Sequence, residues 1–300
     1  MDIEDTREQV RDFLSSRRAR LTPQRAGIAP YGGRRRVAGL RRDEVAMLAG
    51  VSLDYYIRME RGNLSGASDA VLDGLASALQ LDEAEREHLF SLARAAGPSG
   101  RRTRRAASTG VRAVVQQMLD AMVDAPAWVR NGRHDILATN ALCRALYSPI
   151  LSSPVAGATG RRPANTARYI YLDPGAPDFF VDHDTMLADV AAMLRLEAGR
   201  TPHDPGLIEL VGELSTQSEE FRRRWGSHDV RFHRSGVKRL RHPVVGRIDL
   251  NYEALGLFSD PDLRVNVYTA TPDSGDADAL QLLASWAASR EAPMSTERRQ

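Results

Sequence analysis

The chain has 300 residues, of which 42% are hydrophobic and 27% are charged, proportions that are typical of globular proteins with buried cores. This length favours two domains over one. The formal net charge of +2 excludes a wholly polybasic protein, and the single cysteine, Cys143, excludes an internal disulfide framework and a thiolate-rich metal site. The acidic amino terminus and the lack of a long apolar run predict a cytoplasmic protein with no secretory signal and no membrane-spanning helix.

The first third of the chain concentrates positive charge. Residues 1–105 contain 19 arginines against 15 acidic residues, and residues 13–42 contain nine arginines and no acidic residue. A positive field of this density attracts a polyanion, with nucleic acid as the first candidate and a solvated basic face as the alternative. The chain has only one lysine, Lys238, so the choice of arginine over lysine says little about the partner.

Residues 1–96 are predicted to form a compact, all-helical domain. Apolar residues recur with helical spacing in the segments 6–20, 41–49, 53–61, 68–79 and 82–95. Ser68 is a predicted N-cap, and Asp82 and Glu83 place negative charge in the first turn of the last segment. Glycine, proline and arginine dominate residues 97–108, which predicts a linker after this domain.

Residues 109–290 predict an α+β domain with one antiparallel sheet, followed by a disordered tail at 291–300. Asn131-Gly132 between two short apolar runs predicts a β-hairpin, and Asn140 is a predicted cap for the next helix. Helical patterns cover residues 111–124, 140–147, 166–172, 177–199, 205–215, 218–226 and 276–289. Strand-like patterns cover residues 128–129, 135–139, 230–241, 244–252 and 263–270.

The most specific motif is a helix-turn-helix at residues 42–62. Gly50 is placed to take the positive φ that a tight corner requires, and Ala46 supplies a small residue where the two helices cross. Ser52 is the predicted N-cap of the second helix. The apolar residues expected to face the bundle are Val45, Leu48, Val51, Tyr56 and Met59.

The second helix of the motif is predicted to enter the major groove of double-stranded DNA. Arg58 is the candidate for a bidentate contact to guanine, Asp54 is a possible acceptor from cytosine, and Leu53 or Tyr55 can pack on a thymine methyl group. The expected phosphate contacts come from Ser52, Arg41 and Arg42, and from Arg34, Arg35 and Arg36 at the backbone or in a minor groove. Glu60 is expected to pair with Arg17 or Arg18 instead of meeting DNA.

This stretch resembles the Cro/repressor-like (XRE) helix-turn-helix family. Residues 39–46 (GLRRDEVA) and 51–56 (VSLDYY) are similar to one branch, in which an MmyB-like ligand-binding domain follows. Phrases similar to that domain are PAWV at 126–129, NAL at 140–142, FRRRW at 221–225, HDV at 228–230 and RLRHPVVG at 239–246. The resemblance implies a bacterial transcriptional regulator with a PAS-like second domain and a small ligand of the fatty-acid class.

A ligand pocket needs apolar and aromatic walls with a few polar anchors. The residues expected to contact the ligand are Trp128, Tyr147, Arg168, Tyr169, Trp225 and Tyr252, with Tyr171, Phe179, Phe180 and Phe232 as further aromatic candidates. Arg168 is the first candidate for a carboxylate anchor, and a structural salt bridge is its alternative. Each aromatic residue has plain core packing as its alternative.

Neither a metal nor a catalytic group is predicted. His228, His233 and His242 lie near Asp229 in the sequence, but their spacing matches no helical pair of metal ligands. The sequence lacks a nucleophile elbow, a phosphate-binding loop and a dinucleotide fingerprint. We therefore expect a non-enzymatic regulator without a cofactor.

The sequence leaves three alternative functions. The first is a homodimeric regulator in which a small amphiphilic ligand shifts the placement of two DNA-binding domains. The second is a DNA-binding protein whose carboxyl-terminal half binds a protein, as in antitoxins or anti-repressors. The third, an enzyme with a fused regulatory domain, lacks a recognisable set of catalytic residues.

Overall fold

The computed structural model describes residues 3–28, 37–97, 110–157, 162–230 and 234–291. It divides into two compact units, which are considered separately. Unit 1 comprises residues 1–105, 191–211 and 222–232, and unit 2 comprises residues 106–190, 212–221 and 233–300. Unit 1 thus includes two segments that the sequence analysis assigned to the second domain. The predicted linker and tail lie outside the described residues, apart from Gly97 and Glu291.

Unit 1 begins with the five helices that the sequence predicts. These are α1 (Ile3–Arg20), α2 (Arg42–Leu48), α3 (Leu53–Glu60), α4 (Asp69–Ala78) and α5 (Glu83–Ala96). Side chains cap three of them, because Ser52, Ser68 and Asp82 each accept a hydrogen bond from the backbone N–H three residues later. Three later helices each contribute residues to both units. They are α11 (His183–Arg200), α12 (Pro205–Gln217) and α13 (Glu219–Gly226).

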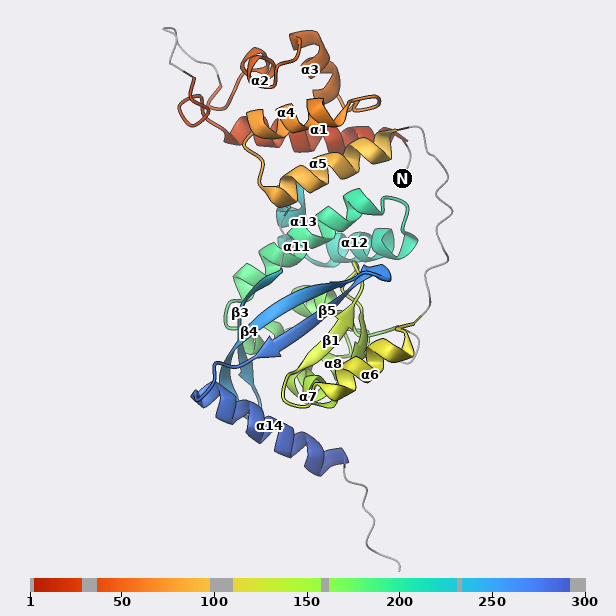
Figure 1. The fold of residues 1–300 in the computed structure, drawn as a ribbon, viewed down its shortest axis with the longest axis vertical. Coiled ribbons are helices and arrows are strands. Elements are labelled where there is room, and N and C mark those ends of the chain that lie inside the picture. Colours follow the sequence, from red (N-terminus) through yellow and green to blue (C-terminus); the bar gives the residue numbers. More distant parts are fainter. Residues whose placement is uncertain (1–2, 29–36, 98–109, 158–161, 231–233, 292–300) are drawn as a thin grey trace, which may run out of the picture. The chain divides into compact units, whose positions relative to one another are not determined.

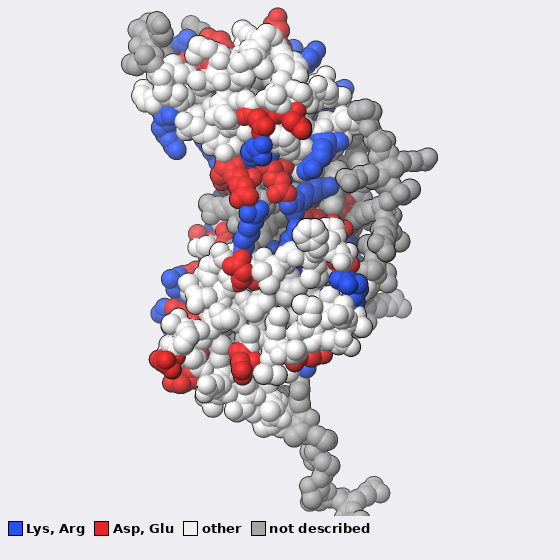
Figure 2. Space-filling view, viewed as in Figure 1, with Lys and Arg blue, Asp and Glu red and all other residues white. Residues whose placement is uncertain are grey.

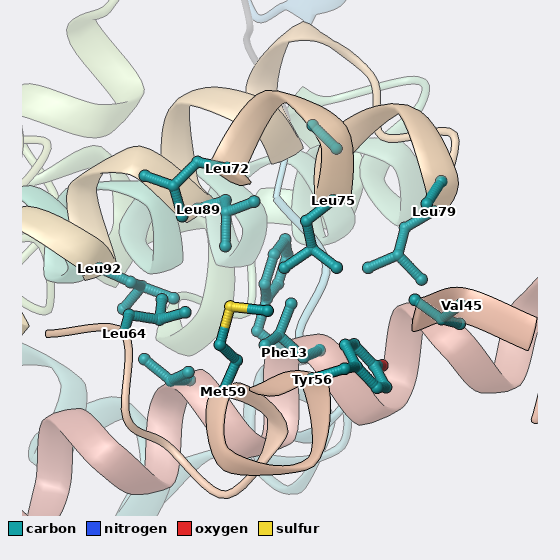
Figure 3. Packing of buried hydrophobic residues seen from close by; sticks show 14 of the residues in the cluster. Phe13, Val45, Tyr56, Met59, Leu64, Leu72, Leu75, Leu79, Leu89 and Leu92 are labelled. Atoms are coloured by element: carbon teal, nitrogen blue, oxygen red, sulfur yellow. The ribbon is translucent and has the colours of Figure 1, made fainter. Parts of the chain in front are cut away.

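A single apolar cluster fills the interior of unit 1. Figure 3 shows Phe13 from α1 close to Tyr56 and Met59 from α3, with leucines from α4 and α5 above them. Tyr56, Met59 and Phe13 are at most 1% exposed. Leu196 of α11 and Val230 belong to the same cluster. The core therefore holds α2 and α3 at a fixed angle, so that the opposite face of α3 is left to solvent.

Unit 2 combines one sheet with helices. The strands are β1 (Ala127–Arg130), β2 (Ile136–Thr139), β3 (Ser235–His242), β4 (Gly246–Leu257) and β5 (Asp260–Thr269). The other helices are α6 (Ala113–Ala121), α7 (Ala141–Leu146), α8 (Ser148–Leu151), α9 (Thr166–Leu172), α10 (Ala176–Phe179) and α14 (Gly275–Glu291), as labelled for the most part in Figure 1. The predicted helix at 177–199 is two helices, α10 and α11, and the short helix α8 has no counterpart in the prediction.

The sheet has the strand order β2-β1-β5-β4-β3, and all its neighbouring strands are antiparallel. This confirms the predicted two-domain fold class, an all-helical domain followed by an α+β domain with an antiparallel sheet. The hairpin about Asn131-Gly132 joins β1 to β2, as predicted. Asn140 caps α7 by accepting from the backbone N–H of Cys143 at 2.8 Å.

The two faces of the sheet have different surroundings. On one face, Val129 and Val265 pack with Val115 and Leu119 of α6 in an apolar cluster. Alternate residues point to the opposite face, because successive side chains along a strand alternate. That face carries Trp128, Tyr252 and Tyr268, and Tyr147, which lies between α7 and α8, packs on it.

Candidate functional site

The corner between α2 and α3 has the geometry that the sequence predicts. Gly50 has φ +68°, and a Cβ at this position would meet nothing within 4 Å, so backbone conformation alone favours glycine. The N–H groups of Gly50 and Val51 donate to the carbonyls of Met47 and Ala46, which closes the end of α2. This arrangement is a helix-turn-helix.

The amino terminus of α3 is ordered by Ser52. Its Oγ accepts from the backbone N–H of Tyr55 at 3.2 Å, which confirms the predicted N-cap. The outer face of α3 then presents Leu53, which is 43% exposed, with the exposed side chains of Asp54 and Arg58. Tyr55 is half-buried, and the guanidinium carbon of Arg58 lies 4.8 Å from the centre of its ring. This stacking holds Arg58 against the helix while its donors remain accessible.

A buried carboxylate fixes α3 to its neighbours. Glu60 is 2% exposed; it pairs with Arg18 at 2.5 Å and with Arg42, and it accepts from the hydroxyl of Tyr56 at 3.3 Å. Burial and the charge of Glu60 raise the pKa of Tyr56 well above its ordinary value, so this tyrosine stays protonated as a donor. The expected pairing of Glu60 with the first helix is confirmed for Arg18.

The arginines around the motif have different environments. Arg41 is exposed at the N-cap of α2, where its backbone N–H donates to the carboxylate of Glu44 at 2.6 Å. Arg42 is half exposed, and its guanidinium forms an ion pair with Glu60. A DNA phosphate that contacts Arg42 must therefore bind the N–H groups that Glu60 does not use. Arg34, Arg35 and Arg36 lie outside the described residues. Leu48 is 37% exposed, so it does not face the bundle as predicted.

Part of the basic segment is used inside unit 1. Arg17 is 3% exposed and pairs with Glu85 at 2.8 Å, although the sequence offered it as a partner for Glu60. Arg20 pairs with Asp229 at 2.5 Å. The run of nine arginines is therefore not one continuous DNA-facing surface, because at least these two side chains are bound to acidic residues of their own unit.

The second candidate site is an aromatic cluster inside unit 2. The structure brings together Trp128, Tyr147, Tyr169 and Tyr252, four of the predicted ligand contacts. The cluster also contains Phe179 and Phe180, which were further candidates, and Tyr268, which was not predicted. The ring centres of the neighbouring pairs lie 4.9–6.3 Å apart, and tilted or edge-on rings predominate. We name these seven residues the aromatic cluster.

Hydrogen bonds run through one part of the aromatic cluster. The indole N–H of Trp128 donates to the hydroxyl of Tyr268 at 3.4 Å, and the hydroxyls of Tyr147 and Tyr268 are in hydrogen-bond contact. Burial raises the pKa of Tyr268 to about 12 and that of Tyr147 well above its ordinary value. Both phenols are therefore protonated at neutral pH.

The only lysine of the chain borders this cluster. Lys238 is 7% exposed, and its Nζ lies 2.9 Å from the sulfur of Met186 and 4.9 Å from the centre of the Tyr252 ring. Burial lowers the pKa of Lys238 to about 8, against the opposing effect of Asp189. Lys238 was not among the residues predicted for the site, although a single lysine among so many arginines was a signal.

The other predicted ligand contacts lie elsewhere. The buried side chain of Arg168 pairs with Glu213 at 2.9 Å, the salt bridge that was the alternative to an anchoring role. Trp225 belongs to unit 1, where the guanidinium carbon of Arg195 lies 3.8 Å from the centre of its ring. Tyr171 donates to the carbonyl of Leu187 and packs edge-on against Phe221, outside the cluster. Phe232 lies outside the described residues.

The histidines considered for a metal are dispersed. His228 belongs to unit 1 and His242 to unit 2, where its Nε2 makes a hydrogen bond to the carbonyl of Ala145 at 3.0 Å. His233 is not among the described residues. Across the part of the chain that the structure describes, no three side chains from His, Cys, Asp and Glu gather as metal ligands. Within the same residues, every helix is too short or too polar to span a bilayer.

Comparison with known families agrees with both halves of this geometry. Residues 12–89 match a helix-turn-helix domain model. Residues 111–283 match the model of the MmyB-like transcription regulator ligand binding domain, which covers more than half of the chain. No curated protein matches the chain. The chain therefore belongs to the family of DNA-binding transcription regulators that carry an MmyB-like ligand-binding domain.

Proposed function

We propose that this regulator binds a specific operator through the outer face of α3. The observation that carries the proposal is the exposure of Leu53, Asp54 and Arg58 on a helix that Gly50 and Ser52 hold in place. Arg58 supplies two donors for guanine, and Asp54 supplies an acceptor-only group for the amino group of cytosine. Arg41 and the accessible part of Arg42 supply charge for phosphates. Such a protein acts in the cytoplasm, where its operator lies.

Selection of bound sequences from random DNA tests this proposal. The wild-type chain is expected to enrich one motif, and Arg58→Ala is expected to relax one base position of that motif by about 1–3 kcal/mol. Arg61→Ala is the matched control, because Arg61 is exposed at the carboxyl end of the same helix. Equal weakening on all sequences by Arg58→Ala would show that this side chain binds only the backbone.

We propose further that unit 2 binds a small amphiphile of the fatty-acid class. The aromatic cluster supports this, since it gathers apolar rings with a few interior hydrogen-bonding groups. A ligand that binds one arrangement of the chain better than another shifts the population that binds the operator. Titration of laurate into the complex of the regulator with its selected operator is expected to change the affinity for DNA, and an unchanged affinity at saturating laurate contradicts the proposal.

We infer that the regulator acts as a homodimer through the outer face of α6. Val114 and Met118 lie one turn apart on this helix and are about half exposed, and Phe258 at the turn between β4 and β5 is fully exposed. The ion pair of Arg112 with Asp260 at 2.6 Å ties the two regions together. The side of unit 2 drawn in Figure 2 is mostly uncharged. Groups of exposed apolar residues mark protein interfaces.

The same patch fits the alternative of a different protein partner. Light scattering of the purified chain separates the two. A mass of two chains that falls to one in Met118→Glu supports the homodimer, whereas a wild-type monomer favours a different partner for this face. Val237→Glu is the control, because Val237 is a similarly exposed apolar residue on β3.

A further inference from the structure

The interior face of the sheet contains a group of buried polar side chains on two adjacent strands. Trp128 of β1 lies directly opposite Asn266 of β5, and Tyr268 follows Asn266 by two residues on the same face. Asn266 and Trp128 are each 4% exposed, and Tyr268 is 2% exposed. Tyr147 reaches this group through its hydroxyl contact with Tyr268. We name Trp128, Tyr147, Asn266 and Tyr268 the donor group.

Trp128, Tyr147 and Tyr268 together have one more hydrogen-bond donor than their mutual contacts use. Their indole N–H and two phenol O–H groups provide three donors, and the two contacts Trp128–Tyr268 and Tyr147–Tyr268 use two of them. One O–H is left, whichever of the two tyrosines donates to the other. The hydrogen bonds of the described residues provide no acceptor for it.

Asn266 adds a further unsatisfied donor. Its Nδ2 is buried and has no hydrogen-bond partner among the described residues. A buried amide N–H without an acceptor destabilises the folded state, so such groups are rare in proteins. The Asn266 amide and one tyrosine hydroxyl, both unsatisfied as donors beside the aromatic cluster, indicate a position for a group that accepts hydrogen bonds.

The charges around the donor group favour an anion over a neutral acceptor. Arg130 lies two residues beyond Trp128 on β1, and its charge lowers the pKa of Tyr147, Tyr268 and Tyr252 against the larger effect of burial. Lys238 is the second cation beside the aromatic cluster; Asp189 and Asp182 act on it with opposite charge, and Asp189 also acts on Tyr252. The tyrosines keep their protons at neutral pH, so they remain donors.

We propose that Asn266 and the Tyr147–Tyr268 hydroxyl pair bind the carboxylate of an apolar ligand, whose chain packs on the aromatic cluster. A carboxylate has about four acceptor sites and no donor, which matches the surplus. This assigns the head group to the sheet and not to Arg168, which is already paired with Glu213. The inference rests on the proposed binding of a fatty-acid-like ligand and specifies which atoms recognise it.

The test compares two probes that differ only in the head group. Calorimetric titration of the full chain at pH 7.5 uses laurate, which carries a carboxylate, and 1-dodecanol, which has the same chain length. The wild type is expected to bind laurate more tightly than 1-dodecanol. Asn266→Leu and Tyr268→Phe are expected to weaken laurate binding about tenfold or more and to change 1-dodecanol binding less than threefold.

Tyr171→Phe, at a half-buried tyrosine of unit 2, is the control for the loss of a tyrosine hydroxyl. Tyr171 donates to the carbonyl of Leu187 outside the donor group, so its loss is expected to leave the ratio of the two affinities unchanged. Equal losses for laurate and 1-dodecanol in Asn266→Leu, or none for laurate, overturn the head-group assignment and leave the ligand class intact. Failure of the wild type to bind either probe overturns the ligand class and the assignment together.

Thermal unfolding separates recognition from folding. Asn266→Leu removes a donor that makes no hydrogen bond to the protein, so the unfolding midpoint is expected to stay unchanged or to rise. A midpoint that falls by several degrees would identify Asn266 as a structural amide and overturn its role as a ligand donor. An unchanged unfolding midpoint together with a loss of laurate selectivity supports the role of Asn266 as a ligand donor.

Discussion

The outer face of α3 and the aromatic cluster of unit 2 use similar residues in opposite ways. On α3, Tyr55 and Arg58 are accessible to a partner, and their positions follow from one short helix with its own cap and corner. In the cluster, Trp128, Tyr147 and Tyr268 are buried and come from three different elements. The difference shows that a surface for reading DNA can be set by local geometry, whereas an interior recognition site depends on the register of distant strands.

Adjacent tyrosines on α3 give the sharpest test of this contrast. Tyr56→Ala removes a fully buried ring and the hydrogen bond to Glu60, so the free energy of unfolding is expected to fall by about 3–5 kcal/mol. Tyr55→Ala removes a half-buried ring, and we expect a loss below about 1.5 kcal/mol together with weaker operator binding. Urea unfolding and DNA titration measure the two effects. Similar stability losses for both variants would break the contrast between core and surface.

Acid is expected to weaken unit 1. Burial lowers the pKa of His88 to about 3, so the unfolded chain, with a histidine pKa near 6.5, takes up the proton first as the pH falls. Stability is complete above about pH 6.5 and is lost progressively toward pH 3, with a loss of about 2 kcal/mol at pH 5 from His88 alone. His228, whose pKa burial lowers to about 4, acts in the same direction.

The variant His88→Leu isolates the first of these contributions. Between pH 8 and pH 5 the free energy of unfolding of the wild type is expected to fall by about 2 kcal/mol relative to that of the variant, because only the wild type has this titrating group. The donor group of unit 2 has no histidine and is expected to contribute nothing in this range. Parallel pH profiles for the two proteins would show that His88 has the same pKa in the folded and the unfolded chain, and would contradict the prediction.

Arg168→Gln tests whether the carboxylate anchor is at the sheet or on α9. Removal of the buried guanidinium leaves Glu213 without this partner, and we expect a loss of about 1–2 kcal/mol in the free energy of unfolding. The ratio of laurate affinity to 1-dodecanol affinity is expected to be unchanged. A selective loss of laurate binding would move the anchor from Asn266 to Arg168.

Gly50→Ala gives the smallest expected effect. The φ of +68° disfavours a Cβ by roughly 1 kcal/mol, while the space around the residue is open. Gly62→Ala is the informative companion, because a Cβ there would meet the backbone carbonyl of Arg7 and must displace α1. Thermal unfolding is expected to rank Gly62→Ala well below Gly50→Ala in stability, and a reversed rank would contradict the packing of α1 on the end of α3.

Local elements were predictable, and long-range partners were not. The helices α2 and α3, their corner and the N-cap depend on residues at most a few positions apart, so helical spacing and Gly50 were sufficient. The sequence predicted that Glu60 pairs with Arg17 or Arg18, and it could not distinguish the two. In the folded chain Arg18 pairs with Glu60, whereas Arg17 pairs with Glu85. Leu48 was expected inside because its spacing fits the apolar stripe, but its side chain lies on the exposed side of the short helix α2.

The sequence by itself determined the helix-turn-helix, the order of the helices and strands, and the supply of aromatic residues in the second half, because each of these follows from neighbours along the chain. Only the tertiary structure decided which aromatics meet. The pairing of β1 with β5 places Trp128 beside Asn266 and Tyr268, although Trp128 and Tyr268 are separated by 140 positions. Chain folding also placed Trp225 in the other unit and Arg168 in an ion pair. Strand register has a period of two residues, so a shift by one position would turn every one of these side chains to the opposite face.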